Sequence, residues 1–392
     1  MVGRFVILAA LACCAGGEPP PIDAAPDGPD DGLPDLETAS WVLDPVIGSG
    51  DDGFVPHMSF TGDGSPVVVW QRNDASAIGF AFRQDAAWFV QFIDAPAGVS
   101  GVFAPDVAGG SGGKAHIVFS GSTQTTSNDV FYVLADGGSL STAVNITSPN
   151  EGGADFDSNP AVAAMADDEV TVLYTYVANS MGMGNRELRA LTFTNPGLPT
   201  TPVTVVDAAS NCTSPRARAS SEGIHAILNC DSGGADEAVY LTNRSGAFVS
   251  QVVNTGTDTV VAPDLDIATN GDIHIVVQGQ ITCPQGMCTE PLYSLNLSPG
   301  AAVTGGTEDF FSPAIALDAF DRPIFVFFDL PGRELFWTFS EGAGFFRPQQ
   351  IDLTGDKLVG TGEDDPATGM PFFALEDRSR SPSIWVAQLV AE

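Results

Sequence analysis

The chain has 392 residues, of which 44% are hydrophobic and only 16% are charged, and its formal net charge is −34. A surface this negative repels phosphate backbones and anionic lipid headgroups, which argues against nucleic-acid binding. The charge is typical of a highly soluble surface, with a polyvalent calcium-binding surface as the weaker alternative; no other cofactor is expected. The 43 glycines and 28 prolines, with no stretch of helical periodicity, indicate a chain that turns often between short strands.

The first twelve residues, Met1–Ala12, have the pattern of an export signal, with Arg4 followed by an apolar core too short to span a bilayer. The core ends in Ala10-Leu11-Ala12-Cys13-Cys14, a junction that resembles a bacterial lipobox. We therefore expect acylation of Cys13, with Cys14 as the alternative site and simple secretion as the alternative route. The protein would then be exported and lipid-anchored to the bacterial cell envelope, at the outer membrane or the cell surface.

Residues 13–38 form an acidic, proline-rich segment, and Ala15–Glu37 within it holds six prolines and seven acids. Such a segment buries too little apolar surface to offset its ordering entropy. We predict an extended, disordered tether, which leaves residues 39–392 for the folded domain.

A repeat organises this domain. Ala262–Gln278 (APDLDIATNGDIHIVVQ) holds a proline, a short apolar run, a polar turn and a second, fully apolar run. Six copies align on prolines that lie 48 to 55 residues apart: Pro56, Pro105, Pro160, Pro215, Pro263 and Pro313. A period of this length marks an array of small sheets.

Each copy predicts an antiparallel hairpin. In its first run, strand A, the second and fourth residues after the proline are mostly apolar, whereas the first and third are polar or small, as in Asp264–Ile267. The second run, strand B, is apolar on both faces and is expected to lie inside the sheet. Two further strands, C and D, follow before the next proline, and four antiparallel strands per repeat describe a propeller blade.

A seventh unit is one strand short. Lys357–Thr361, Met370–Leu375 and Ser383–Leu389 are predicted as its strands A, B and C. Ser40–Ile47 resembles a strand D, and its pairing with Ser383–Leu389 would close the ring and remove free sheet edges. The predicted fold class is an all-β, seven-bladed β-propeller with four-stranded antiparallel blades; six blades with an irregular C-terminal extension are the alternative.

The cysteines fit this hairpin pattern. Cys212 and Cys230 lie symmetrically about Ser221, the centre of one A–B turn, so the hairpin would place them opposite each other. Cys283 and Cys288 are close enough in sequence to close a small ring. Two disulfides suit an oxidising compartment; a four-cysteine metal site is the alternative.

The pattern P-x-[apolar]-A-x-x-x-x-G-x-[apolar]-H-[apolar]-V-[apolar] resembles the repeats of bacterial sialidase-like, BNR-type propeller proteins, many of which are lipoproteins. Asp264–Val277 is the clearest copy, and Pro105–Phe119 is the second. The Asp box of sialidases, Ser-x-Asp-x-Gly-x-x-Trp, is absent from every unit. The resemblance therefore implies the ring but carries over no catalytic residue.

Three histidines lie in B strands. His116 and His274 occupy the same repeat position on different units, and His225 lies one residue out of register. Equivalent positions around a ring do not converge on one point, so we predict a structural role for these histidines and no metal site.

Strand A is the innermost strand of a propeller blade, so its polar residues approach the central channel. A channel mouth where polar groups converge is the default position for a ligand site. The candidate ligand-binding residues are His57, Asp106, Arg216, Arg218, Asp264 and Asp266. Inter-blade ion pairs are the alternative role for this set.

No H-E-x-x-H metal motif and no phosphate-binding loop occurs. Glycoside hydrolysis needs two facing carboxyl groups, but the 49 acids of this chain make that residue type uninformative. We therefore expect a monomeric, non-catalytic binding or scaffold module for a protein or glycan ligand, held at the membrane by its lipid alone. An extracellular glycan hydrolase or lyase is the alternative.

Overall fold

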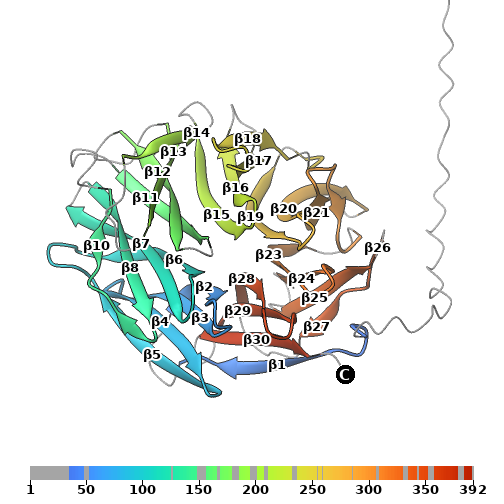
Figure 1. The fold of residues 1–392 in the computed structure, drawn as a ribbon. Coiled ribbons are helices and arrows are strands. Elements are labelled where there is room, and N and C mark those ends of the chain that lie inside the picture. Colours follow the sequence, from blue (N-terminus) through green and yellow to red (C-terminus); the bar gives the residue numbers. More distant parts are fainter. Residues whose placement is uncertain are drawn as a thin grey trace, which may run out of the picture.

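The computed structural model describes residues 35–47, 53–124, 127–147, 156–165, 168–178, 185–194, 201–206, 211–231, 236–253, 255–257, 259–284, 286–305, 309–329, 334–341, 344–351, 357–377 and 384–390. Regular structure in these ranges is entirely β-strand, and no helix there is long and apolar enough to cross a membrane. The sheets surround a central axis, with β2, β6, β23 and β28 toward the centre and β1, β5 and β18 at the periphery (Figure 1). The fold is a β-propeller.

Five sheets stand as separate blades of four or five antiparallel strands. In hydrogen-bonded order, the first blade is β2 (Gly53–Phe60), β3 (Pro66–Arg72), β4 (Ala77–Gln84) and β5 (Ala87–Asp94). Two further blades are β15 (Cys212–Ser220), β16 (Gly223–Asp231), β17 (Asp236–Thr242) and β18 (Val249–Val252), and β19 (Val260–Ile267), β20 (Ile273–Cys283), β21 (Gly286–Leu295) and β22 (Ala301–Ala302). The last two blades are β23 (Phe310–Leu317), β24 (Pro323–Asp329) and β25 (Glu334–Glu341) with β26 (Gly344–Phe345) and β27 (Gln349–Ile351), and β28 (Lys357–Asp364), β29 (Pro371–Asp377), β30 (Ile384–Val390) and β1 (Ser40–Pro45).

The remaining strands form one nine-stranded sheet. They are β6 (Val102–Gly109), β7 (Lys114–Gln124), β8 (Ser127–Asp136), β9 (Ser139–Leu140), β10 (Val144–Asn145), β11 (Phe156–Ala164), β12 (Glu169–Val177), β13 (Glu187–Thr194) and β14 (Val203–Val206). The five separate blades differ from the seven predicted. The physical reason is a parallel pairing of Phe156 with Asn128, which joins β11 to β8 and makes two four-stranded units continuous.

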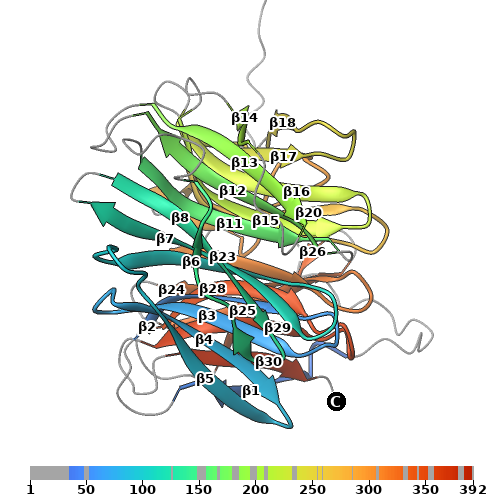
Figure 2. The ribbon, with the colours of Figure 1, turned by 60° about the vertical axis from the view of Figure 1, so that its left-hand side comes forward.

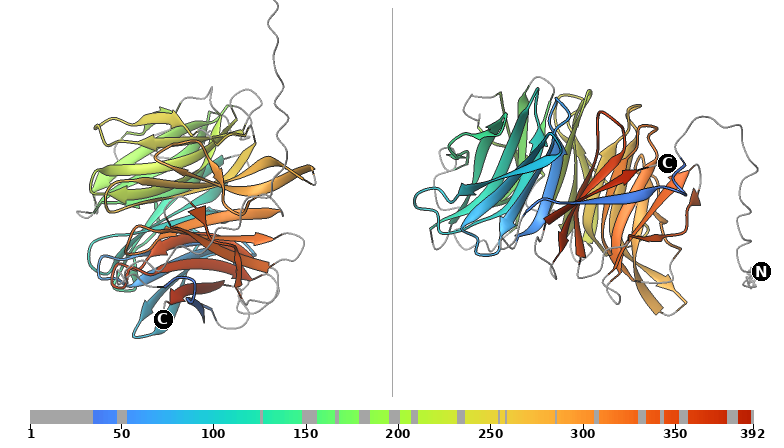
Figure 3. Two further views of the ribbon diagram at one scale, coloured as in Figure 1. Left: turned by 90° about the vertical axis from the view of Figure 1, so that its right-hand side faces the viewer. Right: turned by 90° about the horizontal axis from the view of Figure 1, so that it is seen from below.

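The N-terminal strand completes the last sheet, as predicted. All six residues of β1 pair antiparallel with β30, from Ser40 opposite Val390 to Pro45 opposite Trp385. Trp41 packs edge-on against Trp337 and Phe373, with ring centroids 5.5 and 5.8 Å apart. This strand therefore both closes the ring and covers the apolar interface between the last two blades, which Figures 2 and 3 show side by side.

A bulge interrupts every innermost strand; it lies at the repeat proline in six of them and at Gly360 in β28. The pairing of β2 with β3, for example, shifts register between Phe54 and His57, so that Val55 and Pro56 are unpaired. Proline suits this place because it has no N–H to donate to a ladder. The residue before each proline has positive φ: Val55, Ala104, Asn159, Ser214, Ala262 and Ser312. The bulges turn the prolines toward the mouth of the channel, where they line a pocket.

Both predicted disulfides are confirmed. Cys212 lies directly opposite Cys230 in the pairing of β15 with β16, and the two are bonded. Cys283 and Cys288 are bonded across the β20–β21 hairpin. The first bridge fixes the hairpin that carries Arg216 and Arg218.

Candidate functional site

A pocket of about 310 Å³ lies at the proline end of the channel. Its rim is the ring of bulges, which contributes prolines and small side chains from all around the propeller. Its polar side chains include His57, Arg216, Asp264 and Glu376, from four different sheets. An apolar rim over a few converging polar groups is the usual construction of a small-molecule site.

Polar side chains of strand A join several neighbouring blades. Strand A is a sheet edge, so half of its backbone N–H groups lack a ladder partner and need another acceptor. The residue after the proline, or after Gly360 in the last unit, supplies one: Asp106 Oδ2 accepts Val162 N–H at 2.9 Å, Asp264 Oδ2 accepts Ile315 N–H at 3.2 Å, and Thr361 Oγ1 accepts Met58 N–H at 2.8 Å. Two residues further on, Ser59 Oγ accepts Gly109 N–H at 3.1 Å and Asp266 Oδ2 accepts Leu317 N–H at 2.9 Å. The alternation of polar residues on strand A thus serves ring assembly.

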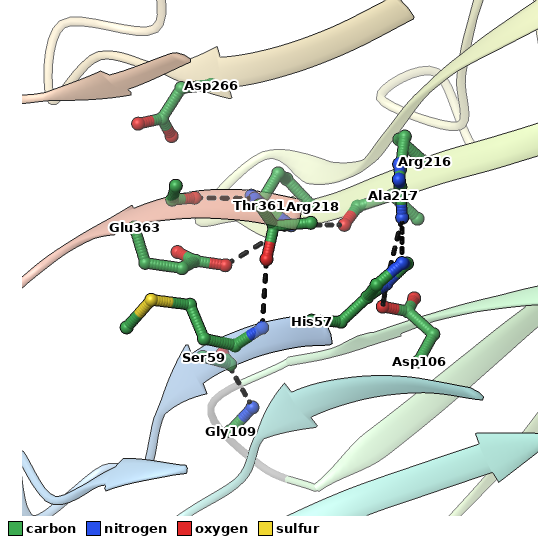
Figure 4. A network of polar contacts seen from close by, with 12 residues as sticks. His57, Ser59, Asp106, Gly109, Arg216, Ala217, Arg218, Asp266, Thr361 and Glu363 are labelled. Atoms are coloured by element: carbon green, nitrogen blue, oxygen red, sulfur yellow. Dashed lines mark hydrogen bonds and ion pairs between the residues drawn. The ribbon is translucent and has the colours of Figure 1, made fainter. Parts of the chain in front are cut away.

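Arg216 and Arg218 occupy the same two positions on β15 but break this pattern. A guanidinium has no acceptor atom, so neither side chain can bond the next strand's N–H. Both instead reach residues far away in sequence (Figure 4). Arg216 contacts His57, and Arg218 lies 3.2 Å from Glu363 Oε1 while donating to Gly362 O at 2.9 Å. These contacts join β15 to β2 and β28.

His57 lies between Asp106 and Arg216 (Figure 4). Its Nδ1 is 2.7 Å from Asp106 Oδ1, and Arg216 Nη1 contacts both ring nitrogens. One tautomer satisfies both neighbours: Nδ1–H donates to Asp106, and Nε2 accepts from Arg216. Burial and the charge of Arg216 lower the pKa of His57 to about 4. The imidazole is therefore neutral near pH 7, with both nitrogens engaged.

The two aspartates of this layer differ in charge preference. Burial acts to raise the pKa of Asp106, but the hydrogen bond from His57 and the nearby charges lower it on balance. Burial raises the pKa of Asp264 despite Arg218 and Arg216. Asp264 is only 3% exposed, and its Oδ1 has no hydrogen-bond partner among the described residues. Asp264 is thus the incompletely satisfied acid of the pocket.

A second layer lies deeper in the channel around Arg218. Burial, Asp266 and Asp364 raise the pKa of Glu363 to about 8. Burial and the charge of Asp364 raise the pKa of Asp266 to about 7. Several carboxyl groups therefore share one guanidinium, and not all of them are ionised at neutral pH.

The structure divides the six predicted site residues. His57, Arg216 and Asp264 line the pocket; Asp106 supports His57, and Arg218 and Asp266 belong to the deeper layer. Sequence reasoning missed Thr361, Glu363 and Glu376, because the last unit has Gly360 where the other units have proline. The available signal for Glu376 was an acid directly after the apolar run Pro371–Leu375, at a position that still belongs to the strand.

The three B-strand histidines pair with tyrosines on strand C. Nδ1 of His116, His225 and His274 contacts the hydroxyl of Tyr132, Tyr240 and Tyr293. His225 was expected to lie out of register, but it makes the same contact because its A–B turn is one residue shorter, with Ser220 paired to Gly223. No group of three or more His, Cys, Asp or Glu side chains in the described part of the chain is arranged to hold a metal.

Gly109–Gly113 has the G-x-S-x-G spacing of a hydrolase nucleophile turn. It joins two strands, β6 and β7, rather than a strand and a helix. Ser111 Oγ donates to Asp168 Oδ2 at 2.8 Å, and the Ser111 N–H donates to Asp168 Oδ1 at 2.7 Å. Ser111 therefore links two hairpins.

The predicted lipidation sites, Cys13 and Cys14, lie outside the described residues.

Comparison with protein-family models and with curated protein sequences finds no match. Among solved structures, an ulvan lyase of polysaccharide lyase family PL25, bound to -[GlcA(1-4)Rha3S]-, aligns with a TM-score of 0.58 and 10% identity, over 88% of this chain and 95% of that one. A sialidase of Trypanosoma rangeli aligns with a TM-score of 0.51 and 13% identity; the alignment covers 86% of this chain but 55% of the sialidase. The Hadza microbial sialidase Hz136 aligns with a TM-score of 0.50 and 9% identity, over 83% and 76% of the two chains. At these identities the likeness shows the fold alone, a β-propeller that resembles those of sialidases.

Proposed function

We propose that this protein is a non-catalytic binding module of the cell envelope, which holds a group of a protein or glycan ligand in the channel-mouth pocket. The observation that carries the proposal is the pocket itself, where an apolar rim surrounds the polar side chains of His57, Arg216, Asp264 and Glu376. An apolar cavity with a few converging polar groups is the usual construction of a ligand site. We expect the ligand to bind in the pocket of one protein chain, without a second copy of the protein.

Binding is favoured over catalysis by the way the polar groups are held. His57 has both ring nitrogens engaged, which leaves no free nitrogen to act as a general base. Glu376 Oε2 accepts the Val55 N–H at 3.0 Å, and Asp264 Oδ2 accepts the Ile315 N–H. The two carboxyl groups are thus part of the backbone scaffold, unlike the free pair that glycoside hydrolysis needs.

The export signal at Met1–Ala12 and the lipobox-like Cys13 support a lipid anchor, with the acidic residues before the fold as a tether. Leu36, which was predicted to lie in that tether, is only 2% exposed and packs in the apolar core of the last two blades. We also infer that the nine-stranded sheet is two blades, giving seven in all. The support is that β6 and β11, like the other innermost strands, each carry a register shift, and that a single parallel residue pair joins the two units.

The first test is a glycan array and a peptide array probed with the exported domain and with Val55→Trp. Val55 lines the pocket, is 40% exposed, and makes its polar contact through its backbone N–H. A tryptophan there should fill the mouth without removing a buried contact. We expect ligand retention by the wild type and a loss of affinity of about tenfold or more in the variant.

Melting curves of both proteins provide the control for folding. If a correctly folded Val55→Trp variant binds the ligand as well as the wild type does, the ligand does not bind in this pocket. Release of a cleaved product from a bound glycan would show that the protein is a hydrolase or a lyase and not a binding module.

A further inference from the structure

We infer that the channel-mouth pocket receives one uncharged, apolar side chain of a protein ligand, and that the β20–β21 hairpin beside the pocket contacts the same ligand. The inference rests on the proposed function and chooses between the two classes of ligand named there. Three features of this end of the propeller support it: an apolar rim, ionisable groups that already have partners, and an uncharged hairpin that extends past the rim.

The wall of the pocket is mostly apolar. All six repeat prolines line it, together with Val55, Leu358 and Val359. Val55 is 40% exposed, so its side chain is open to a ligand. The volume of about 310 Å³ is at the lower end of the range for ligand pockets, about 300–1,000 Å³. The pocket therefore has room for a single side chain rather than for an extended ligand.

Every ionisable group that lines the pocket already has a partner within the protein. His57 contacts Arg216 through its ring nitrogens, and Asp264 and Glu376 each accept a backbone N–H. The amide of Asn159 also donates to a neighbouring blade. Because groups of both signs line the pocket, a charged ligand of either sign meets a like charge there. The pocket therefore favours an uncharged group.

An apolar side chain matches this arrangement better than a sugar does. A sugar ring carries several hydroxyl groups, and each hydroxyl that leaves water without a new hydrogen bond costs free energy. The ionisable groups of the pocket are engaged with one another or with the backbone, so they offer few replacements for those bonds. An apolar side chain needs no such bond, and burial of its surface is favourable in itself.

The β20–β21 hairpin extends past the rim of the pocket. Its strand β20 is the hydrogen-bonded neighbour of β19, which carries Pro263 into the rim. Gln278 lies opposite Val261, just before the bulge, and the pairing of β20 with β21 continues to Cys283, five residues further. At about 3.3 Å per residue, the hairpin extends about 17 Å beyond this level. A disulfide between Cys283 and Cys288 closes its tip.

The surface of this hairpin suits a protein partner. Residues 273–289 include no Asp, Glu, Lys or Arg, although the chain has 49 acids. Met287, near the tip, is 63% exposed. A flexible thioether makes adaptable apolar contacts, which is why methionine is common on protein-binding surfaces. The pocket and the hairpin, one strand apart, thus offer two contact points to one polypeptide.

The first experiment titrates four peptides into the exported domain and follows binding by NMR. Each peptide has leucine, asparagine, lysine or aspartate between two runs of glycine. Leucine and asparagine have nearly the same shape and differ in polarity. We expect a dissociation constant for the leucine peptide about tenfold or more below that of the asparagine peptide, and no binding of the two charged peptides at about 10 mM. Val55→Trp should abolish binding of the leucine peptide.

Methyl glucoside and octyl glucoside test the other occupants of the pocket. The first is an uncharged sugar, and the second adds a flexible alkyl chain like that of a lipid. We expect both to bind more weakly than the leucine peptide. Tighter binding of methyl glucoside would show a sugar site, and tighter binding of octyl glucoside alone would show a site for a lipid chain. Either result overturns the inference.

The contact with the hairpin is tested by adding a second leucine to the peptide, at each position up to about eight residues from the first. At the matching distance, the second leucine should tighten binding about threefold or more, and Met287→Lys should remove that gain. Leu295→Lys is the matched control, because Leu295 is 37% exposed at the other end of β21. This control should keep the gain.

Equal affinity for the leucine and asparagine peptides, or no binding of the leucine peptide at about 10 mM, overturns the inference about the pocket. A gain that survives in Met287→Lys, or no gain at any position of the second leucine, overturns the contact with the hairpin. The proposed function still stands in each case if the arrays return a ligand that Val55→Trp loses. It fails separately if the arrays return none.

Discussion

Deletion of residues 1–47 is expected to destabilise the propeller and to make the chain associate. The deletion removes β1 and leaves β30 as a free edge, which is a template for pairing with another chain. It also removes Trp41 from its contacts with Trp337 and Phe373, a loss of about 3 kcal/mol by itself. We expect a melting temperature lower by about 10 °C or more, measured by circular dichroism, and association of the chain in light scattering.

The control is a deletion of residues 1–34, which ends before the first residue of the described fold. It should melt within about 2 °C of the full chain, since it removes no backbone hydrogen bond of the sheet. If the two deletions melt alike, β1 is not what completes the last blade.

Substitution of Arg218 by methionine is expected to destabilise the domain by about 3 kcal/mol at pH 8, because it leaves Glu363 and Asp266 buried without their counter-ion. The cost should shrink toward pH 5. Both carboxyl groups have a folded-state pKa raised by burial and mutual repulsion, to about 8 for Glu363 and about 7 for Asp266. A raised pKa contributes stability below the unfolded value, and that stability is lost as pH rises through the folded value.

The histidines limit the stability of the fold at acid pH, whereas the buried carboxyl groups limit it at alkaline pH. Burial lowers the pKa of His57, His116, His225 and His274 to about 4, so their contribution is present above their unfolded value and is lost as pH falls through about 4. The wild type should therefore be most stable at about pH 6 in thermal melts.

The variant Glu363→Gln tests whether Glu363 causes the loss of stability at alkaline pH. Glutamine imitates the protonated acid, so this variant should gain stability over the wild type at pH 9 and much less at pH 5. Combined with Arg218→Met, it should recover most of the alkaline loss. A wild type and a Glu363→Gln variant with parallel pH profiles would show that Glu363 is ionised throughout and that the deeper layer is an ordinary ion pair.

Local signals in the sequence predicted the fold to the level of hairpins. The alternation on strand A, the apolar strand B and the symmetric placement of Cys212 and Cys230 all depend on residues close in sequence, and the structure confirms them. The pairing of β1 with β30 was also predicted, because a missing strand and a spare one matched. The count of separate blades was not, because joining β8 to β11 depends on a parallel contact at Phe156 that no periodicity reveals.

Most residues of the candidate site were predicted from the sequence, but the contacts between them were not. Asp106 and Asp264 were recognised as residues of the inner strands, and the structure shows that each caps the backbone of the next blade. The contact of Arg216 with His57 spans 159 positions of sequence and depends on which blades face each other across the ring. Glu363 was missed for a simpler reason, since the last unit lacks the proline that set the register of the other six.

The most direct test of the central claim, that a ligand is held at the channel mouth, is imidazole ¹⁵N NMR during titration with the ligand that the arrays identify. The chain has four histidines, of which His57 lines the pocket while the other three contact tyrosines inside the blades. We predict that the His57 resonances shift in proportion to occupancy and that those of His116, His225 and His274 stay in place. A titration that saturates with His57 unmoved, or that shifts one of the other three instead, would contradict the account.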